Sequence, residues 1–537
     1  MGQAGPLPGV PTVVTMTTSL RRTTPAFLST PSRRGFLSLG GAAGVVLTAV
    51  ACTRSSAEDT ALDGDVVTGA VDGDFWDMST VHTMSVALDE DAYDEMIAAY
   101  QDDQTKNWIE ADVEIDGSVF EKAGIKLKGN SSLRSLAGGG AGGGGMGGGA
   151  PGGGGDQASD GGGDQASDGG GDGMGAAGGD TEGDGTISAD DPTGLPWVIR
   201  LDKYTDGQSF SGRTEFVVRG SNTETSLNEA VALDVLSEAG VPAEKYAFTR
   251  FSVNGADAKL RLVLDLPDDD LWNADAFDST GATFKADSGG DYTYRGDTEE
   301  DYTDVFDAKF VGDDLTDEES FAALGSFLQF INESEDDEFA SDLGSRLDVD
   351  GFATYLAVQE LVQNSDDIDG PGNNSYLHYD PSAERWEVVA WDQNLSFGGM
   401  GGGGGRGGGG QGGGGQGGGG DMASDAGGDE ATGGMPGGVP DGAQAPGRDG
   451  DTDAQGGGGG GGMGGSNILS ERFLAESTFA DLYEETLASV EEAVYTSGTA
   501  SDRLETLIAL LKAEASDLVD SADVDSDGEA ISAVIES

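Results

Sequence analysis

The sequence is poor in the residues that form disulfides and zinc sites. It has one cysteine, Cys52, and two histidines, His82 and His378, among 537 residues. One cysteine cannot form an internal disulfide, and these three side chains cannot supply the four ligands of a structural zinc site. The sequence also lacks GxxxxGK(S/T) and GxSxG motifs, which argues against a P-loop and against the nucleophile turn of an α/β-hydrolase.

Basic residues are scarce as well. The chain has 28 Lys and Arg against 98 Asp and Glu, a formal net charge of −70. Such a surface repels phosphate groups, so nucleic acid is not an expected partner, and any site for a phosphorylated ligand needs a metal ion or local cations. The acidic excess fits either solubility in a salty medium or attraction of basic protein substrates.

Glycine, in contrast, is abundant. Most of the 94 glycines stand in two tracts, 137–185 and 398–466. These tracts have few apolar side chains to bury, so we expect them to be disordered. The sequence thus predicts seven segments. A leader (1–56) is followed by a β-rich part (57–136 and 191–310) that contains the first insertion (137–190). A helical part (311–398), the second insertion (399–466) and C-terminal helices with an acidic tail (467–537) complete the chain.

The leader carries an export pattern. Arg33 and Arg34 in SRRGFLSLGGAAGVVLTAVAC precede an apolar run that ends at Cys52. Twin arginines before such a run are typical of twin-arginine export, and LTAVAC resembles a lipobox. We therefore expect an exported protein whose lipidated Cys52 holds it on the extracytoplasmic face of the membrane. Cleavage at AVA without lipidation and retention as a single-span anchor are the alternatives.

Apolar periodicity predicts an α+β fold. Two hairpins are expected around Asp116-Gly117 and Asn254-Gly255, and a helix from Leu227 to the stop at Gly240, with Ser226 and Glu229 as a capping box. Residues 315–365, 471–495 and 500–519 have helical patterns. The end of the chain, DVDSDGEAISAVIES, begins like a calcium loop. It has Val534 where a bidentate Glu is required, so we expect a polar tail.

The segment NNSYLHYDPSAERWEVVAWDQN, residues 373–394, predicts a hairpin with oxygen ligands at its open end. A turn centred near Ala383 would place Asn374 opposite Asp392. An amide oxygen and a carboxylate suit Mg²⁺, which keeps water or phosphate oxygens at its other positions. The preceding NSDDIDGPG adds Asp366, Asp367 and Asp369, one of which could accept a proton from a hydroxyl group. Ordinary strand-end and turn roles for these residues are the alternative.

Six segments in order resemble the spore coat protein H (CotH) kinase family. They are GIKLKGNSSLR, LDKY with FSGRTEFVVRGS, SVNG, TFKAD, NSDDIDGPGNNSYLHYD and VVAWDQNLSFGG. The resemblance implies an atypical protein-kinase-like fold with a β-rich N-terminal lobe and a mostly helical C-terminal lobe. It also implies transfer of the ATP γ-phosphate to Ser or Thr hydroxyls of protein substrates, with Mg²⁺ or Mn²⁺.

The resemblance also assigns roles to residues. It implies Asp392 and Asn374 as metal ligands and Asp366 as the catalytic aspartate, with Asp367 and Asp369 as alternatives; Asn394 stands where the family often has an acidic residue. It further implies nucleotide contacts from Lys128, Asn130 and Ser131 in KGNSS, from Lys203 with Glu229 as its helix partner, and from Lys285. Lys203 as a surface lysine and Glu229 as a capping residue are the alternatives.

Two other functions fit the sequence. Export and the acidic glycine-rich tracts also suit a catalytically idle surface or adhesion protein that keeps the fold. An extracytoplasmic hydrolase of phosphate compounds is the third hypothesis.

Overall fold

The computed structural model describes residues 62–129, 133, 136, 187–220, 223–277, 281–286, 292–303, 305–313, 315–364, 366–368, 374–398 and 467–537. All of them belong to one unit of the chain, Thr60–Ser537. The leader and the glycine-rich tracts lie outside these ranges, Gly398 aside, and so do the predictions made for them.

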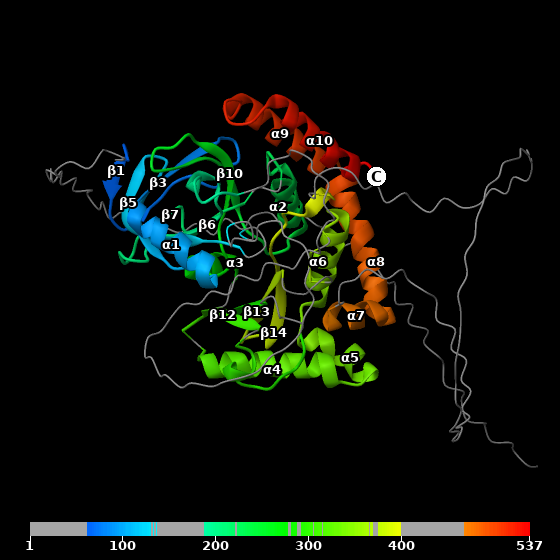
Figure 1. The fold of residues 1–537 in the computed structure, drawn as a ribbon. Coiled ribbons are helices and arrows are strands. Elements are labelled where there is room, and N and C mark those ends of the chain that lie inside the picture. The colour runs from blue at the N-terminus through cyan, green and yellow to red at the C-terminus, as the bar shows by residue number, and fades with distance from the viewer. Residues whose placement is uncertain are drawn as a thin grey trace, which may run out of the picture. The chain divides into compact units, whose positions relative to one another are not determined.

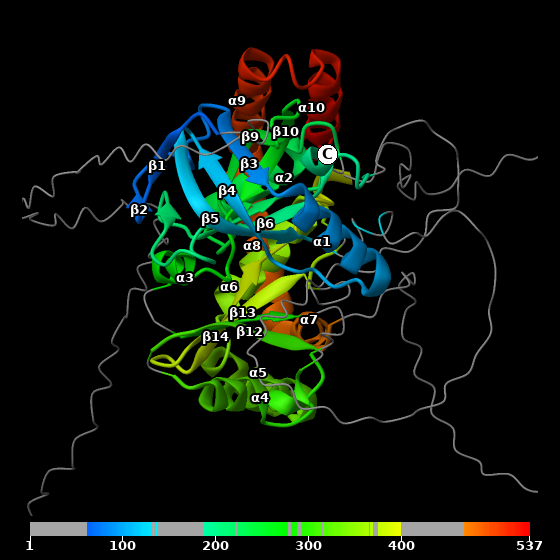
Figure 2. The same cartoon turned by 60° about the vertical axis from the view of Figure 1, so that its left-hand side comes forward.

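Seven strands close into a barrel (Figures 1 and 2). In order around the barrel they are β5 (Ser118–Leu127), β4 (Ile109–Ile115), β3 (His82–Leu88), β9 (Tyr246–Val253), β10 (Lys259–Leu264), β8 (Glu215–Val218) and β6 (Trp197–Arg200). β6 pairs back with β5, which closes the ring. Neighbours are antiparallel except β3 and β9. Two short parallel additions are β1 (Asp65–Val67) on β5 and the pair β2 (Ala70–Val71) with β7 (Ser209–Phe210).

The two predicted hairpins of the barrel are confirmed. Both turns have positive φ at their central residues: 47° and 81° at Asp116 and Gly117, and 50° and 70° at Asn254 and Gly255. Asn, Asp and Gly tolerate this geometry, and it matches the twist of the flanking strands. Alternate apolar residues then face a common core, in which Val113, for example, is fully buried. Helix α1 (Glu90–Asp103) packs against β4.

A second, antiparallel sheet has the order β12 (Phe306–Val311), β11 (Ala282–Ala286), β13 (Ser375–Asp380) and β14 (Arg385–Ala390). Around it in sequence are α3 (Asp270–Ala276), α4 (Asp317–Glu333), α5 (Asp336–Asp342) and α6 (Val349–Leu361). Phe284 of β11 meets Phe321 of α4 edge-to-face at 5.1 Å between ring centroids. This sheet and its helices share one apolar core with α2 (Leu227–Ala239).

The C-terminal segment is helical: α7 (Ile468–Ala475), α8 (Ser477–Glu491), the π-helix η5 (Glu492–Thr496), α9 (Thr499–Glu514) and α10 (Ser521–Ile535). α8 packs along α6, while α9 and α10 pack against α2, as Figures 1 and 2 both show. α2 is therefore largely covered, and its residues from Leu227 to Leu233 are all buried. Short 3-10 helices complete the fold: η1 (Pro192–Gly194), η2 (Glu299–Asp301), η3 (Leu343–Ser345) and η4 (Ser396–Gly398).

The prediction of a polar tail is wrong, because α10 occupies that segment. Val524, Gly528, Ile531 and Ile535 are buried at helical spacing. A side chain at Gly528 would stand 2.5 Å from Cδ1 of Ile508, so glycine lets α10 approach α9 closely. The mixed α+β fold is confirmed. Among the described residues no helix is long and apolar enough to cross a membrane.

Candidate functional site

An arginine between two carboxylates connects the barrel, helix α2 and the second sheet. Arg219 follows β8, and its Nε donates to Oε2 of Glu229 on α2 at 3.1 Å. Its Nη2 lies 3.0 Å from the other oxygen of Glu229 and also contacts Oδ1 of Asp392, just after β14. Arg219 and Glu229 are buried. Burial raises the pKa of Glu229, the positive Arg219 lowers it, and the negative Asp392 raises it.

Local structure turns Glu229 inward. Ser226 has a left-handed φ of 54° and makes no side-chain cap on α2, so the predicted capping box does not form. Thr225 Oγ1 accepts from the amide of Leu227 at 3.2 Å instead. Asn228 Nδ2 donates to the carbonyl of Asn394 at 2.7 Å. The start of α2 is therefore bonded to the segment that follows Asp392.

A second buried arginine holds the backbone of the first. Arg261 of β10 donates through Nε to the carbonyl of Arg219 at 2.9 Å and through Nη2 to the carbonyl of Leu195 at 3.0 Å. Burial lowers the pKa of Arg261 to about 10, so this guanidinium remains charged at neutral pH. These hydrogen bonds from Arg261 fix the backbone at Arg219 and so position the Arg219 side chain.

The loop after α6 brings Asp366 and Asn374 together. Asn374 is fully buried, and its Nδ2 donates to the carbonyl of Asp366 at 2.8 Å. Its Oδ1 is buried without a hydrogen-bond partner among the described residues. An unpaired buried acceptor is costly, so it indicates a missing donor or cation. Burial and the negative charge of Asp392 raise the pKa of Asp366, while Asn374 and the positive Lys285 lower it.

The register of the hairpin differs by one residue from the prediction. Ser375 pairs with Ala390 and Asp380 with Arg385, so continuation of the ladder would set Asn374 opposite Trp391. The turn contains the residues 381–384, so its centre lies between Ser382 and Ala383 rather than near Ala383. Asp392 lies beyond the strand and has a left-handed φ of 62°, a conformation that redirects the chain there. It interacts with Asp366 and Arg219 from that position.

Lysines surround these carboxylates. Lys285 of β11 is buried, and its Nζ donates to the carbonyl of Ala286 at 2.8 Å and lies 5.3 Å from the ring centroid of Tyr376. Burial, then repulsion by Lys128, lowers the pKa of Lys285 to about 8, and the negative charge of Asp392 opposes this shift. Lys128, just after β5, has its Nζ 4.9 Å from the ring centroid of Trp391.

The structure brings together five of the predicted site residues: Asp366, Asn374, Asp392, Lys285 and Lys128. The predicted pair of Lys203 and Glu229 is replaced, because the ion-pair partner of Glu229 is Arg219. Lys203 instead has its Nζ 5.0 Å from the ring centroid of Trp108. Asp367 is buried beside Asp366. Asp369, Asn130, Ser131 and Cys52 lie outside the described residues.

Arg219 is the main residue that sequence reasoning missed. It directly follows the apolar strand EFVV and stands ten residues before Glu229. A rare basic residue at the end of an apolar strand was a usable signal, yet only the fold shows that Glu229 turns toward it.

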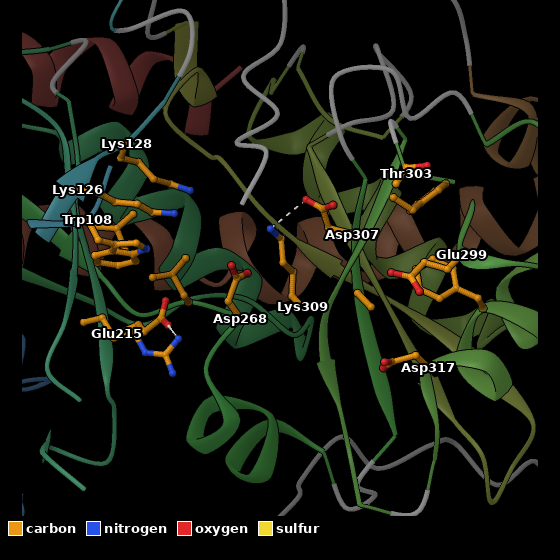
Figure 3. Close-up of a pocket in the computed structure, with 16 residues that line it drawn as sticks. Trp108, Lys126, Lys128, Glu215, Asp268, Glu299, Thr303, Asp307, Lys309 and Asp317 are labelled. Carbon is orange, nitrogen blue, oxygen red and sulfur yellow. Dashed lines mark ion pairs between the residues drawn. The ribbon is translucent and has the colours of Figure 1, made fainter. Parts of the chain in front are cut away.

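A pocket of about 390 Å³ adjoins the site (Figure 3). The barrel contributes Lys126 and Lys128 on one side, and β12 contributes Lys309 on the other. Lys309 forms an ion pair with Asp307 at 3.1 Å. Asp268 also lines the pocket, and the Tyr376 hydroxyl donates to it at 2.8 Å. The lining of the pocket therefore combines apolar residues such as Leu266 and Phe306 with four basic and five acidic side chains.

Carboxylates can supply only some of the ligands that a small hard cation would need at this site. Within the described part of the chain no three His, Cys, Asp or Glu side chains are grouped so that they could hold a metal ion. The pair predicted from the sequence has one carboxylate, Asp392, and one amide oxygen, that of Asn374. Its remaining ligands would come from phosphate and water, as Mg²⁺ sites often arrange.

Residues 193–523 match a family model described as CotH kinase protein, which is more than half of the chain. The matched segment contains Arg219, Glu229, Asp366, Asn374 and Asp392, whereas Lys126 and Lys128 precede it. No curated protein matches the chain.

Proposed function

The chain belongs to the CotH kinase family, and from this premise we propose that it is an atypical protein kinase. It would transfer the γ-phosphate of ATP to Ser or Thr hydroxyls of protein substrates, with Mg²⁺ or Mn²⁺. The proposal assigns the barrel to an N-terminal lobe and the second sheet with its helices to a C-terminal lobe, with ATP in the pocket between their residues.

One observation carries the proposal. Asp366 is hydrogen-bonded to Asn374 and interacts with Asp392 and Lys285, beside a pocket lined by further lysines. In a chain with a net charge of −70, cations gathered at one place favour a polyphosphate ligand there. Phosphoryl transfer mainly requires positioning and charge neutralisation, and this arrangement suits both.

Asn374 and Asp392 would hold the metal ion. The unpartnered Oδ1 of Asn374 is an acceptor that a cation would satisfy, and the Asp392 carboxylate is partly exposed. Mg²⁺ held by these two residues would supply positive charge to offset that of the phosphates.

Asp366 would accept the proton of the attacking substrate hydroxyl. The hydroxyl oxygen would bond to the γ-phosphorus while the bond between this phosphorus and the β–γ bridging oxygen breaks. A carboxylate whose pKa lies above the ordinary value is a better proton acceptor. Asp367 and Asp369 remain alternatives for this role. Lys128 and Lys285 would neutralise the phosphates.

Phosphate transfer by the purified chain tests this function. Labelled ATP, Mg²⁺ or Mn²⁺ and a basic Ser-rich protein are expected to give a labelled protein product. Asp392→Ala and Asp366→Asn are expected to abolish the label, while Asp257→Asn, on the exposed turn between β9 and β10, leaves it unchanged. Transfer that survives both site substitutions would reject the assigned site.

The place of action is proposed to be the extracytoplasmic face of the membrane, with export by the twin-arginine route and a lipid on Cys52. Arg33 and Arg34 before the apolar run and Cys52 at its end support this. Cys52→Ala is expected to release the exported chain from the membrane fraction. An unchanged membrane fraction would reject lipid anchoring.

A catalytically idle surface protein is the second candidate. The ion pair of Arg219 with Asp392 favours it, because this guanidinium already neutralises the carboxylate assigned to the metal. Failure of the chain to bind nucleotide with metal, under conditions in which it is folded, would favour this candidate.

A further inference from the structure

Three buried amide side chains connect the two segments that carry Asp366 and Asp392. Gln359 on α6, Asn364 in the loop after α6 and Gln393 after β14 are 1%, 6% and 1% exposed. The Nδ2 of Asn364 donates to Oε1 of Gln359 at 2.9 Å and to Oε1 of Gln393 at 3.4 Å. Side chains that are distant in sequence thus form a bridge from the loop after α6 to the segment after β14.

Asn364 also holds the backbone of Asp366. Its Oδ1 accepts from the amide of Asp366 at 3.3 Å, which is the bond to the second residue along the chain that asparagine side chains form in turns. The Nδ2 of Asn374 donates to the carbonyl of Asp366 at 2.8 Å. Both backbone polar groups of Asp366 are therefore bonded to asparagine side chains, which limits the positions that its carboxylate can take.

Gln393 has a corresponding role at Asp392. Its Nε2 donates to the carbonyl of Trp391 at 3.3 Å, so the bond spans Asp392. Asp392 has a φ of 62°, and a residue other than glycine keeps such a conformation only where the surrounding structure enforces it. The Oε1 of Gln393 accepts in addition from Oγ of Ser396 at 3.4 Å. Gln393 therefore stabilises the backbone conformation that directs the Asp392 side chain.

These amides are a costly choice for a buried region. Ala357 and Val358, the neighbours of Gln359 in α6, belong to the main apolar core. The Nε2 of Gln359 is buried without a hydrogen-bond partner among the described residues. Apolar side chains of the same shape can replace a buried polar pair at little cost in stability, whereas a polar network specifies one arrangement. Amides beside Asp366 and Asp392 therefore serve position more than stability.

We propose that Asn364 and Gln393 are positioning residues that hold Asp366 and Asp392 at a fixed separation. The inference rests on the proposed function, in which Asp366 accepts the proton and Asp392 binds the metal ion. Each amide acts through the backbone of its neighbour. Because the two amides bond to each other, a shift of one segment is transmitted to the other. Phosphate transfer is sensitive to such shifts, since a displacement of about 1 Å can lower a rate about 100-fold.

Hydrogen exchange of the full chain without ligand tests the bridge itself. Asn364→Leu and Gln393→Met remove the amides and keep a similar shape. Gln393→Met is expected to speed exchange about fivefold in peptides that cover 366–368, the size of change that loss of one hydrogen bond gives. Asn364→Leu is expected to do the same in peptides that cover 391–396. Each substitution thus acts on the segment that it does not belong to.

Asn332→Leu is the matched control. Asn332 on α4 donates through Nδ2 to the carbonyls of Tyr292 and Leu328 at 2.8 and 2.7 Å. Its substitution removes two hydrogen bonds of an asparagine side chain outside the bridge. Exchange in both segments is expected to stay unchanged in this variant.

Kinetics with labelled ATP and a Ser-rich protein test the role of the bridge. Asn364→Leu and Gln393→Met are each expected to lower kcat about 10-fold and to leave the KM for ATP unchanged. The double variant is expected to lose about 10-fold as well, rather than about 100-fold, because both substitutions break the same bridge. Asn332→Leu is expected to keep its kcat. Circular dichroism checks that the variants are folded to the same extent.

The outcomes separate the bridge from the kinase function. Coupled exchange in a chain that transfers no phosphate would support the bridge and contradict the function. Transfer with unchanged kcat in the single variants, or with additive losses in the double variant, would overturn the positioning role alone. Exchange that changes only in the segment that carries the substitution would overturn the bridge.

Discussion

At the scale of single residues, Arg219 has the most consequential set of contacts. It is buried and touches Glu229 and Asp392, which come from different elements. A buried arginine that neutralises two carboxylates cannot be removed without leaving charge in a medium that solvates it poorly. Its role therefore combines stability with the position of Asp392.

We predict that Arg219→Ala lowers the free energy of unfolding by about 3–5 kcal/mol, because Glu229 would be left as an uncompensated buried charge. Arg219→Met combined with Glu229→Leu is expected to recover most of that loss, since both charges are then absent. Urea unfolding followed by circular dichroism measures both effects. A loss below about 0.5 kcal/mol in Arg219→Ala, the usual range for surface substitutions, would contradict the buried ion pair.

Lys285 gives the site a predicted pH dependence. Its pKa of about 8 in the folded chain means that it is positively charged below that pH and neutral above it. Its attraction for phosphate is therefore present at pH 7 and is lost as the pH rises through about 8. The affinity for ATP with Mg²⁺, measured from pH 6 to 10, is expected to fall along this limb.

The matched variant is Lys285→Arg, because a guanidinium stays charged over the whole range. Its affinity for ATP is expected to lack the decrease near pH 8. The same decrease in both proteins would show that another group titrates there.

The single residues also show what the sequence could and could not predict. Asp366, Asn374 and Asp392 were predicted from polar motifs around one hairpin, and Lys285 from the family resemblance. The structure places these four residues close together. The register was missed by one residue, because the prediction centred the turn near Ala383, whereas the observed turn is centred between Ser382 and Ala383. The partner of Glu229 was missed because the sequence does not show which basic residue faces the buried start of α2.

At the scale of elements, α2 depends on the C-terminal helices. Arg503 of α9 lies 3.1 Å from Asp234 of α2, and Thr225, before α2, donates to Asp527 of α10 at 2.6 Å. These contacts connect α2, which carries Glu229, and the residue before it to both C-terminal helices. The segment of α10 was predicted as a polar tail because it begins like a calcium loop but lacks the required Glu. Its buried stripe instead packs against α9 and α2.

We predict that Arg503→Ala and Asp527→Ala each speed hydrogen exchange in α2. Loss of one such contact costs about 1 kcal/mol, which corresponds to roughly a fivefold change in an opening equilibrium. Mass spectrometry of the peptides that cover 227–239 measures it. Glu505→Gln and Glu529→Gln change exposed residues of the same two helices and are the controls. Unchanged exchange in the first two variants would contradict the bracing of α2 by these helices.

At the scale of the whole molecule, the charge distribution matters more than the net charge. Of the ten lysines of the chain, Lys126, Lys128 and Lys309 line the first pocket and Lys285 lies beside it. A chain with a net charge of −70 thus gathers four of its ten lysines at one place, where five carboxylates also line the pocket. Closure of the barrel was also beyond the sequence, because β5 and β6 pair across a glycine-rich insertion that hides their proximity.

The central claim is that Asn374 and Asp392 bind a divalent cation and so allow ATP to bind. Its most direct test is calorimetric titration of the full chain with ATP, once in the presence of Mg²⁺ and once in the presence of EDTA. We predict binding only with Mg²⁺, and its loss in Asn374→Ala and Asp392→Ala but not in Asp257→Asn. Equal ATP binding in EDTA, or in either site variant, would contradict the claim.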